Sequence, residues 1–274
     1  MNAPRTDSVV GERVCRYGAW AVVTGASDGI GRAFAAELAA HGLHLVVVAR
    51  RGERLRALAQ ELASQHGTQT RVLALDLGHS GALDTLRAAT ADLDVGLLVA
   101  AAGYGSTGPL AASDLACELD QLQVNVGAVL AQCWHFGRTF AERGRGGIVL
   151  MSSVVAFQGT PMSANYAATK AYVQSLAEAL QRELKPCGVD VIASAPGPVG
   201  TGFAERARMR MASAENPAVV AGETLRALGR RTTVRPGGLA KLLGWSLATA
   251  PRALRVQIMG RIMGGMTVTQ RRVG

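Results

Sequence analysis

Short hydrophobic runs alternate with longer stretches of helical spacing along most of this chain. The hydrophobic runs lie at residues 19–24, 43–49, 71–75, 95–100, 147–151 and 189–194, and helical patterns lie between them at 30–41, 53–65, about 80–91, 114–140 and 164–184. Strands that are apolar on both faces and alternate with helices are typical of a parallel sheet covered on both sides. The pattern therefore predicts an α/β fold with a doubly wound parallel sheet.

The same pattern predicts a single domain. No internal repeat or low-complexity linker interrupts it, so we assign residues 1–235 to one domain and 236–274 to a helical, basic C-terminal extension. The extension mixes apolar residues with arginines, and Pro251 divides it.

Composition narrows the class of protein. The chain has 274 residues, of which 49% are hydrophobic and 18% charged, which excludes a disordered chain. No run of about 18 apolar residues predicts a spanning helix, and the first 18 residues lack the apolar region of a signal peptide. The four cysteines are scattered without metal-ligand spacing, so we expect reduced thiols, no metal site and a cytoplasmic protein.

The net charge of +9 is uneven. No acidic residue follows Glu223, and that stretch carries ten basic residues, so residues 1–223 are close to neutral. A nucleic-acid-binding protein would show a more general basic surface, and we expect no nucleic-acid partner. Three lysines accompany 26 arginines, a bias that genomic base composition would also produce.

A glycine-rich turn, TGASDGIG at residues 24–31, follows the first predicted strand and opens the first helix. Glycines let the backbone approach a pyrophosphate, and the free N–H groups at a helix N-terminus attract the anion. The turn alone is also compatible with an ordinary tight strand–helix connection. Its position in the first strand–helix unit favours dinucleotide binding.

The end of the second strand indicates which dinucleotide binds. An acidic residue there would bond the ribose 2′-OH of NAD, whereas this strand ends in Arg50 and Arg51. A guanidinium suits the 2′-phosphate of NADP(H), although either arginine could merely solvate the helix start. Asp76, at the end of the third strand, could hold the adenine amino group or cap the following helix.

Tyr166 and Lys170 have i, i+4 spacing within a helical pattern and therefore share one helical face. A free tyrosine has a pKa of about 10. A nearby ammonium or nicotinamide cation favours the phenolate and would lower that pKa, so that Tyr166 could act as a general acid or base. The hydroxyls of Ser152 and Ser153 precede it at a strand end, and Ser153 could donate to a developing oxyanion. Alone, this spacing also suits a surface pair.

With these motifs combined, residues 18–235 resemble the short-chain dehydrogenase/reductase family, which has a Rossmann fold. The resemblance implies that Ser153 polarises the substrate oxygen, Tyr166 transfers the proton, and Lys170 lowers the tyrosine pKa and binds the nicotinamide ribose. It also implies that Asn125 holds a water in the proton relay. Without the resemblance, Asn125 would be interpreted as a helix-surface amide.

The resemblance further implies a cofactor site along the carboxyl ends of the strands. Val199 would contact the carboxamide through its backbone, and Thr201 through its side chain. The full set is Gly25, Ser27, Asp28, Gly29, Ile30, Gly31, Arg50, Arg51, Asp76, Leu77, Ala101, Ala102, Gly103, Tyr166, Lys170, Pro196, Gly197, Val199 and Thr201.

One motif departs from the family. The family has Asn-Asn-Ala-Gly after the fourth strand, where this chain has alanine at 100–102 and then Gly103. We expect the missing amides to reduce stability or cofactor affinity without changing the reaction class.

The residues predicted to face a substrate are mostly apolar, which favours a hydrophobic carbonyl compound. They are Tyr104, Phe157, Gln158, Pro161, Met162 and the segment 202–231. Methionines in the helix-prone part of that segment could form an adaptable cover or pack in the core. The C-terminal extension could lie on an anionic membrane as a peripheral contact, or pack on the domain or on a partner subunit.

These observations predict an NADP(H)-dependent oxidoreductase of lipophilic ketones or aldehydes and secondary alcohols, with steroid, 3-oxoacyl and aromatic-ketone substrates all open. The alternative from another class is a non-catalytic NADP(H)-sensing protein. The resemblance implies a homodimer or homotetramer that joins through the helices at 114–140 and 164–184.

Overall fold

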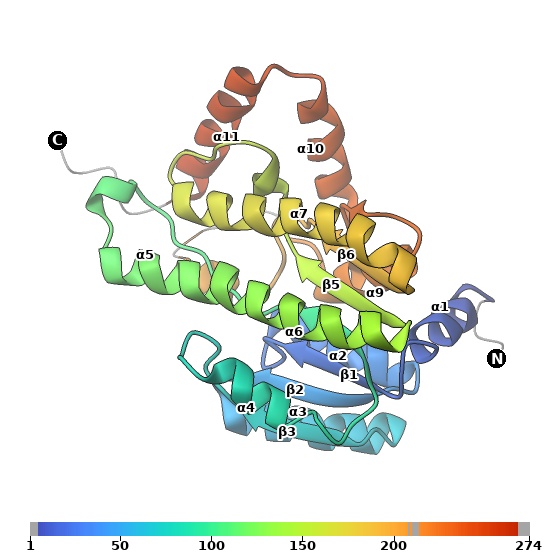
Figure 1. Ribbon diagram of the computed structural model, residues 1–274. Helices are drawn as coiled ribbons and strands as arrows, with labels where there is room; N and C mark the ends of the chain where they lie inside the picture. The colour runs from blue at the N-terminus through green and yellow to red at the C-terminus, as the bar shows by residue number, and fades with distance from the viewer. Residues whose placement is uncertain (1–4, 208, 210–213, 268–274) are drawn as a thin grey trace.

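The computed structural model describes residues 5–207, 209 and 214–267, and among these residues seven strands form one parallel sheet in the order β3-β2-β1-β4-β5-β6-β7 (Figure 1). The strands are β1 (Trp20–Thr24), β2 (His44–Ala49), β3 (Thr70–Ala74), β4 (Val95–Ala100), β5 (Gly146–Met151), β6 (Val189–Ser194) and β7 (Thr233–Val234). The hydrophobic pattern predicts the first six. It misses β7, because two residues are too short to show a period.

Helices cover both faces of the sheet, so the predicted doubly wound Rossmann fold is confirmed. The helices are α1 (Arg5–Cys15), α2 (Gly29–Ala40), α3 (Gly52–His66), α4 (Ala82–Ala88), α5 (Leu115–Leu122), α6 (Ala128–Arg143), α7 (Ala164–Leu184), α8 (Phe203–Arg206), α9 (Pro217–Ala227), α10 (Gly238–Ala248) and α11 (Arg252–Met266). The sequence pattern misses α1.

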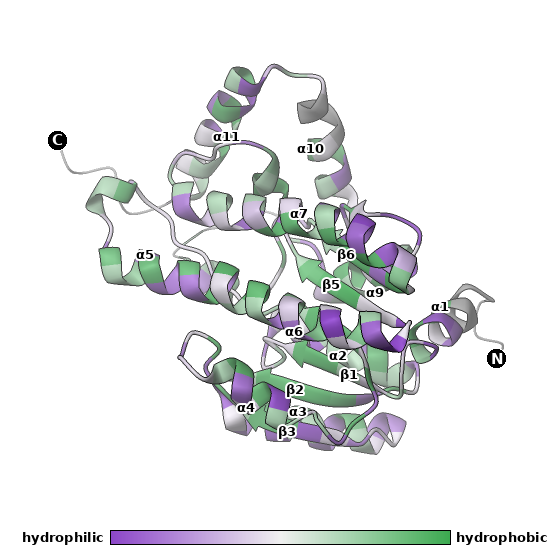
Figure 2. Cartoon of the chain, in the orientation of Figure 1, coloured by the Kyte–Doolittle hydropathy of each residue, from purple (hydrophilic) through white to green (hydrophobic). Residues whose placement is uncertain are grey.

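The alternation of side chains along each strand supplies two hydrophobic cores. In β1, Ala21 and Val23 pack with α2, α3 and α9, whereas Val22 between them packs with α6 and α7. Successive strand residues point to opposite faces, so a run that is apolar at every position serves both layers. Figure 2 shows the strands as mostly hydrophobic ribbons between helices that mix hydrophobic and polar residues.

The predicted helix at 114–140 is confirmed as one helical run from Leu115 to Arg143, but it is not α-helical throughout. It consists of α5 and α6, joined by a π-helical turn at Gln123–Gly127. Such turns add a residue within a helix and are frequent at functional sites. Here the turn carries Asn125, which is fully buried, so the interpretation of this residue as a surface amide is wrong.

The C-terminal extension packs on the rest of the fold. Helices α10 and α11 flank Pro251, as the sequence predicts. Ala240 and Met259 join a hydrophobic cluster with Val154, Val155 and Ala167. Figure 1 shows the two helices beside α7, at the end of the sheet where β5 and β6 lie. This agrees with the alternative in which the extension packs on the domain. The domain boundary at residue 235 stays a prediction.

Two surface features bear on the other predicted partners. Within the described chain, no helix is long and apolar enough to cross a bilayer. Hydrophobic side chains are exposed along α5 and α6, among them Leu115, Leu119 and Trp134. The predicted subunit contact through these helices stays a prediction, as does peripheral membrane contact.

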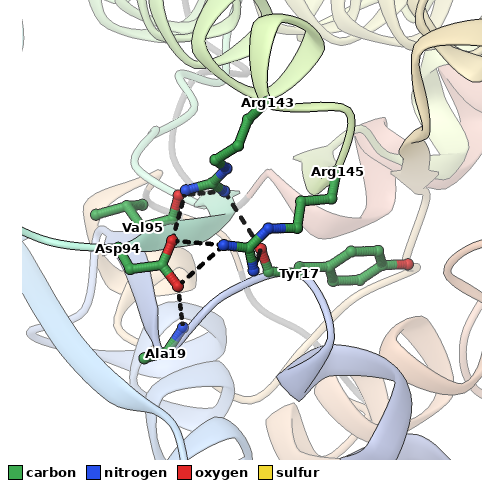
Figure 3. A network of polar contacts seen from close by, with 6 residues as sticks. All are labelled: Tyr17, Ala19, Asp94, Val95, Arg143 and Arg145. Atoms are coloured by element: carbon green, nitrogen blue, oxygen red, sulfur yellow. Dashed lines mark hydrogen bonds and ion pairs between the residues drawn. The ribbon is translucent and has the colours of Figure 1, made fainter.

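A polar network joins the ends of four elements on the side of the sheet opposite the carboxyl ends of its strands (Figure 3). Asp94 accepts hydrogen bonds from Arg143 at 2.8 Å, from Arg145 at 3.1 Å and from the backbone N–H of Ala19 at 3.2 Å. Both arginines also donate to the carbonyl of Tyr17. One carboxylate thus holds together the starts of β1, β4 and β5 and the end of α6.

We predict that Asp94→Ala lowers the free energy of unfolding by about 1–2 kcal/mol, since it leaves two partly buried guanidinium groups without their anion. The matched control is Asp84→Ala, which removes an i, i+3 ion pair whose carboxylate is 79% exposed. The control should change stability little. Urea denaturation of both variants checks this, and equal losses would contradict it.

Candidate active site

A cavity of about 460 Å³ opens at the carboxyl ends of the parallel strands. Its wall includes residues that follow β1, β2, β3, β4, β5 and β6 directly, because parallel strands bring all their carboxyl ends to one edge. Every predicted catalytic or cofactor-binding residue except Asn125 lines it: Gly25, Ser27, Asp28, Gly29, Ile30, Gly31, Arg50, Arg51, Asp76, Leu77, Ala101, Ala102, Gly103, Ser153, Tyr166, Lys170, Pro196, Gly197, Val199 and Thr201. The structure therefore brings together residues spread over most of the chain.

The glycine turn has the close backbone packing expected of an anion cradle. Gly25 has a φ of +69°, and a Cβ at Gly31 would lie 2.4 Å from the carbonyl oxygen of Gly25. No side chain fits at either position. Asp28 precedes α2 but makes no side-chain hydrogen bond to its first turn. The N–H groups of that turn therefore remain available beside the cavity.

A threonine hydroxyl braces the loop that lacks the family's amides. Thr24 Oγ1 accepts hydrogen bonds from the backbone N–H groups of Ala101 and Ala102, each at 3.2 Å, and lies 3.4 Å from the carbonyl of Val99, to which it donates. Thr24 is fully buried. The loop after β4 is thus held to β1 without asparagine side chains, and the effect of their loss on stability stays a prediction.

Guanidinium groups gather at the end of β2. Arg51 Nη2 donates to Ser27 Oγ at 3.1 Å and to Asp28 Oδ2 at 3.4 Å, and Arg54 Nη1 lies 3.8 Å from the same carboxylate. Arg50 Nη1 lies 3.8 Å from Asp76 Oδ2. The sequence analysis missed Arg54, although it lies one helical turn beyond the two predicted arginines.

Asp76 lies in the cavity wall and does not cap the next helix. Its Oδ1 accepts the backbone N–H of Gly78 at 3.0 Å, which closes a turn directly after β3. Helix α4 begins later, after Gly81. The helix-cap alternative for Asp76 is therefore wrong, and the adenine contact stays a prediction.

Ser153, Tyr166 and Lys170 face one another across the end of β5. The Ser153 hydroxyl lies beside the phenol of Tyr166 and acts to lower its pKa. Lys170 Nζ donates to the carbonyl of Met151 at 2.8 Å and lies 5.7 Å from the centroid of the Tyr166 ring. Helix α7 supplies the tyrosine and the lysine, and the strand end supplies the serine. The i, i+4 pair thus lies in the cavity wall, with Lys170 buried and Tyr166 partly buried, and the surface alternative is wrong.

Burial controls the pKa values of this pair. Burial raises the pKa of Tyr166 to about 12, although the neighbouring Ser153 hydroxyl acts to lower it. It also lowers the pKa of Lys170 to about 8, because the charged amine loses its water. The prediction that Lys170 lowers the pKa of Tyr166 is therefore not met in this structure. Desolvation of the phenol outweighs an ammonium that points at the Met151 carbonyl.

Asn125 lies behind the cavity wall. Its side-chain oxygen accepts the N–H of Tyr104 at 3.1 Å, and its amide nitrogen donates to the carbonyl of Tyr104 at 2.8 Å and to Thr169 Oγ1 at 3.1 Å. The amide thus fixes the backbone after Gly103 against α7. A role in holding water stays a prediction.

The far end of the cavity is apolar and is built by segments after β6. Phe203 on α8 lies with its ring centroid 5.4 Å from that of Tyr166. The remaining apolar lining on this side comes from the C-terminal extension and the described part of the segment before α9: Met209, Leu243, Met259, Ile262, Met263 and Met266. The sequence analysis missed the residues of the extension, since no local pattern shows where two terminal helices dock.

Several predicted substrate contacts are wrong. Tyr104 lines the cavity, but Phe157, Gln158, Pro161 and Met162 do not. Phe157 packs under the Arg235 guanidinium, and Gln158 bonds back to the carbonyl of Val154. Helix α11 packs beside this loop, with Gly260 next to Pro161. The helix therefore lines the part of the cavity that the loop was predicted to line. Of the predicted methionine cover, Met209 lines the cavity, and Met211 lies outside the described residues.

With this geometry in view, comparison with known proteins gives the family. A model of the short chain dehydrogenase family matches residues 19–212. The chain therefore belongs to the short-chain dehydrogenase/reductase family of oxidoreductases.

Individual relatives agree with this assignment. The 7beta-hydroxysteroid dehydrogenase of Collinsella aerofaciens is 35% identical over 178 residues, which cover 64% of this chain and 67% of that protein. A solved structure of a 7beta-hydroxysteroid dehydrogenase matches with a TM-score of 0.82 at 28% identity, covering 90% of this chain and 98% of the other. A short-chain dehydrogenase from Sphingobium yanoikuyae in complex with NADPH matches with a TM-score of 0.75 at 26% identity. The match covers 93% of this chain and 98% of the other.

We predict that the buried amine of Lys170 makes stability depend on pH. The folded-state pKa of about 8 lies below the usual value of 10.5, so between these values the unfolded chain binds a proton that the folded chain does not. The free energy of unfolding of the wild type should therefore rise with pH through this window, relative to Lys170→Met.

Urea denaturation at intervals from pH 7 to pH 10.5 measures this difference. The control is Lys241→Met, which removes a lysine side chain that is 58% exposed and should keep the wild-type slope. A constant difference between wild type and Lys170→Met would contradict the prediction.

Proposed function

We propose that this protein is an NADP(H)-dependent reductase of lipophilic ketones or aldehydes, reversible as a secondary-alcohol dehydrogenase. The observation that carries the proposal is the shared cavity. Ser153, Tyr166 and Lys170 face the same space as the glycine turn at one end and an apolar wall at the other. Such a space suits a dinucleotide and a hydrophobic carbonyl compound side by side.

The residues present fit the cofactor. The turn at Gly25 and Gly31 excludes any Cβ and leaves N–H groups facing the cavity, as a pyrophosphate requires. The loop with Val199 and Thr201 would receive the nicotinamide, and Lys170 the adjoining ribose. A bound NADPH supplies the hydride that reduces the carbonyl carbon.

The protein's own part is to hold and move the proton. Tyr166, with a pKa near 12, is a phenol at neutral pH and is therefore ready to donate its proton to a carbonyl oxygen as that oxygen gains charge. Ser153 donates a second hydrogen bond to the same oxygen. In the oxidising direction the phenol must first lose its proton, so alcohol oxidation is favoured at higher pH.

NADP(H) is preferred over NAD(H) in this proposal. The strand end that would meet the ribose carries Arg50 and Arg51. The nearby carboxylates form ion pairs with these arginines, Asp76 with Arg50 and Asp28 with Arg51. Basic groups there favour a 2′-phosphate. The complex of the Sphingobium yanoikuyae relative with NADPH supports this assignment.

The apolar wall indicates the substrate. Methionines and isoleucine from α11 offer an adaptable hydrophobic surface opposite Tyr166. The relatives named for 7beta-hydroxysteroids support a steroid ketone as the first substrate to test. In this proposal α10 and α11 close the substrate site, which gives the C-terminal extension a role without a membrane.

We predict that Tyr166→Phe lowers the rate of NADPH-dependent reduction by about 100- to 10,000-fold, because it removes the proton donor, while NADPH still binds. The control is Tyr172→Phe, which alters a partly exposed tyrosine on the same helix and should keep the activity. Steady-state rates with a panel of steroid, 3-oxoacyl and aromatic ketones measure this. NADPH binding without turnover by the wild type across that panel would instead support the non-catalytic alternative.

We predict that Met263→Ala raises the KM for bulky ketones by about 5- to 30-fold, because it removes about 1–2 kcal/mol of apolar contact. The KM for a small ketone such as acetone should change little. Leu254→Ala is the matched control, because Leu254 lies on the same helix with 44% of its surface exposed and away from the cavity. Parallel changes for bulky and small ketones would count against the proposed role of α11.

A further inference from the structure

A fourth guanidinium reaches the arginine group at the end of β2 from a distant part of the chain. Arg206 ends α8 and lines the same cavity as Arg50 and Arg51. Partial burial and the neighbouring guanidinium of Arg51 lower the pKa of Arg206. Arg206 follows Arg51 by more than 150 residues, so only the tertiary structure makes them neighbours.

The backbone that carries Arg206 is held against the glycine turn. A Cβ at Gly202 would lie 2.6 Å from Asp28 Oδ2, and one at Gly29 would lie 2.5 Å from the Thr201 methyl group. Asp28 is the same carboxylate that pairs with Arg51 and Arg54. The start of α8 and the end of β2 therefore meet on either side of Asp28.

Arg206 itself has spare hydrogen-bonding capacity. Its Nε donates to the carbonyl of Gly202 at 3.4 Å. Among the described residues, its two terminal nitrogens have no hydrogen-bond or ion-pair partner. These nitrogens present four N–H donors, which suit the oxygens of a phosphate.

The charges of the cluster match a phosphate monoester. Among the described residues, Arg50, Arg51, Arg54 and Arg206 face Asp28 and Asp76, which leaves a net charge of +2. Three of the pairs are long, at 3.4 to 3.8 Å, and so provide less than full compensation. A phosphate monoester carries a charge of about −1.5 to −2 at pH 7.

We propose that Arg206 is a ligand of the cofactor's 2′-phosphate, supplied by α8 on the substrate side, and that it determines the preference for NADPH together with Arg50 and Arg51. This inference rests on the proposed NADP(H)-dependent function. The contact of Gly202 with Asp28, the carboxylate that pairs with Arg51, places α8 at the 2′-phosphate end, since Arg51 follows the strand whose tip meets the adenosine ribose. Phe203, on the same helical turn, packs on Tyr166, so this phosphate contact also fixes one wall of the substrate site.

The test measures the binding of NADPH and NADH to full-length wild type, Arg206→Gln and Arg206→Lys by isothermal titration calorimetry. Arg206→Gln should weaken NADPH binding by about 10-fold or more, because a charge-assisted bond to phosphate is lost, and should change NADH binding less than about 2-fold. The NADPH affinity of Arg206→Lys should lie between those of the wild type and Arg206→Gln. The control Arg231→Gln changes an exposed arginine that does not line the cavity and should leave both affinities unchanged.

Adenosine 2′-monophosphate and adenosine 5′-monophosphate, as competitors of NADPH, locate the contact. Arg206→Gln should weaken the binding of adenosine 2′-monophosphate and leave the binding of adenosine 5′-monophosphate unchanged. Equal weakening of both nucleotides would overturn the inference, because Arg206 would then serve the pyrophosphate or the fold. Unchanged NADPH binding would also overturn it.

The wild type separates the failure of this inference from that of the proposed function. If the wild type prefers NADPH and Arg206→Gln keeps that preference, the inference about Arg206 is wrong while the cofactor assignment stands. If the wild type binds NADPH and NADH equally well, the cofactor assignment is wrong, and the role of Arg206 is wrong with it.

Discussion

The bond from the buried ammonium of Lys170 to the carbonyl of Met151 is the contact on which the arrangement of this site depends. It is 2.8 Å long and joins α7 to the last residue of β5. A charge away from water is costly unless it is hydrogen-bonded, so this helix has one favourable position on the strand. Tyr166, one helical turn before Lys170, then meets Ser153, two residues beyond Met151. The same burial raises the pKa of the phenol, so that Tyr166 keeps its proton at neutral pH, as its proposed role requires.

The rest of the cavity follows from the parallel sheet. Six strands place their carboxyl ends at one edge, and each contributes a short connection with one task. The connection after β1 approaches closely because Gly25 and Gly31 carry no side chains, and the hydroxyl of Thr24 holds the connection after β4 beside it. The connection after β2 brings positive charge. These connections are far apart in the sequence and adjoin one another in space.

The C-terminal extension completes the half of the cavity that the sheet leaves open. Met259 and Met263 are buried against the fold and also line the cavity, so the same side chains stabilise the docked helix and shape the proposed substrate site. Methionine suits both tasks because its unbranched side chain adapts to irregular surfaces. Helix α8 also lines the cavity and carries Phe203 and Arg206, which links the apolar wall to the cluster of arginines.

The amino-acid pattern alone determined the six main strands, the helices that alternate with them and the residues at their carboxyl ends. These features depend on local periodicity and on the rule that parallel strands end together. The loop at 195–201 was assigned to the cofactor site only through the family resemblance, and it also lines the cavity. The tertiary structure decided what depends on long-range docking. It placed α11 where Phe157, Gln158, Pro161 and Met162 were expected, buried Asn125 in a π-helical turn, and set Arg206 beside Arg51. It also reversed the expected pKa shift of Tyr166, because the loss of solvent depends on the whole surrounding fold and not on the residue one turn away.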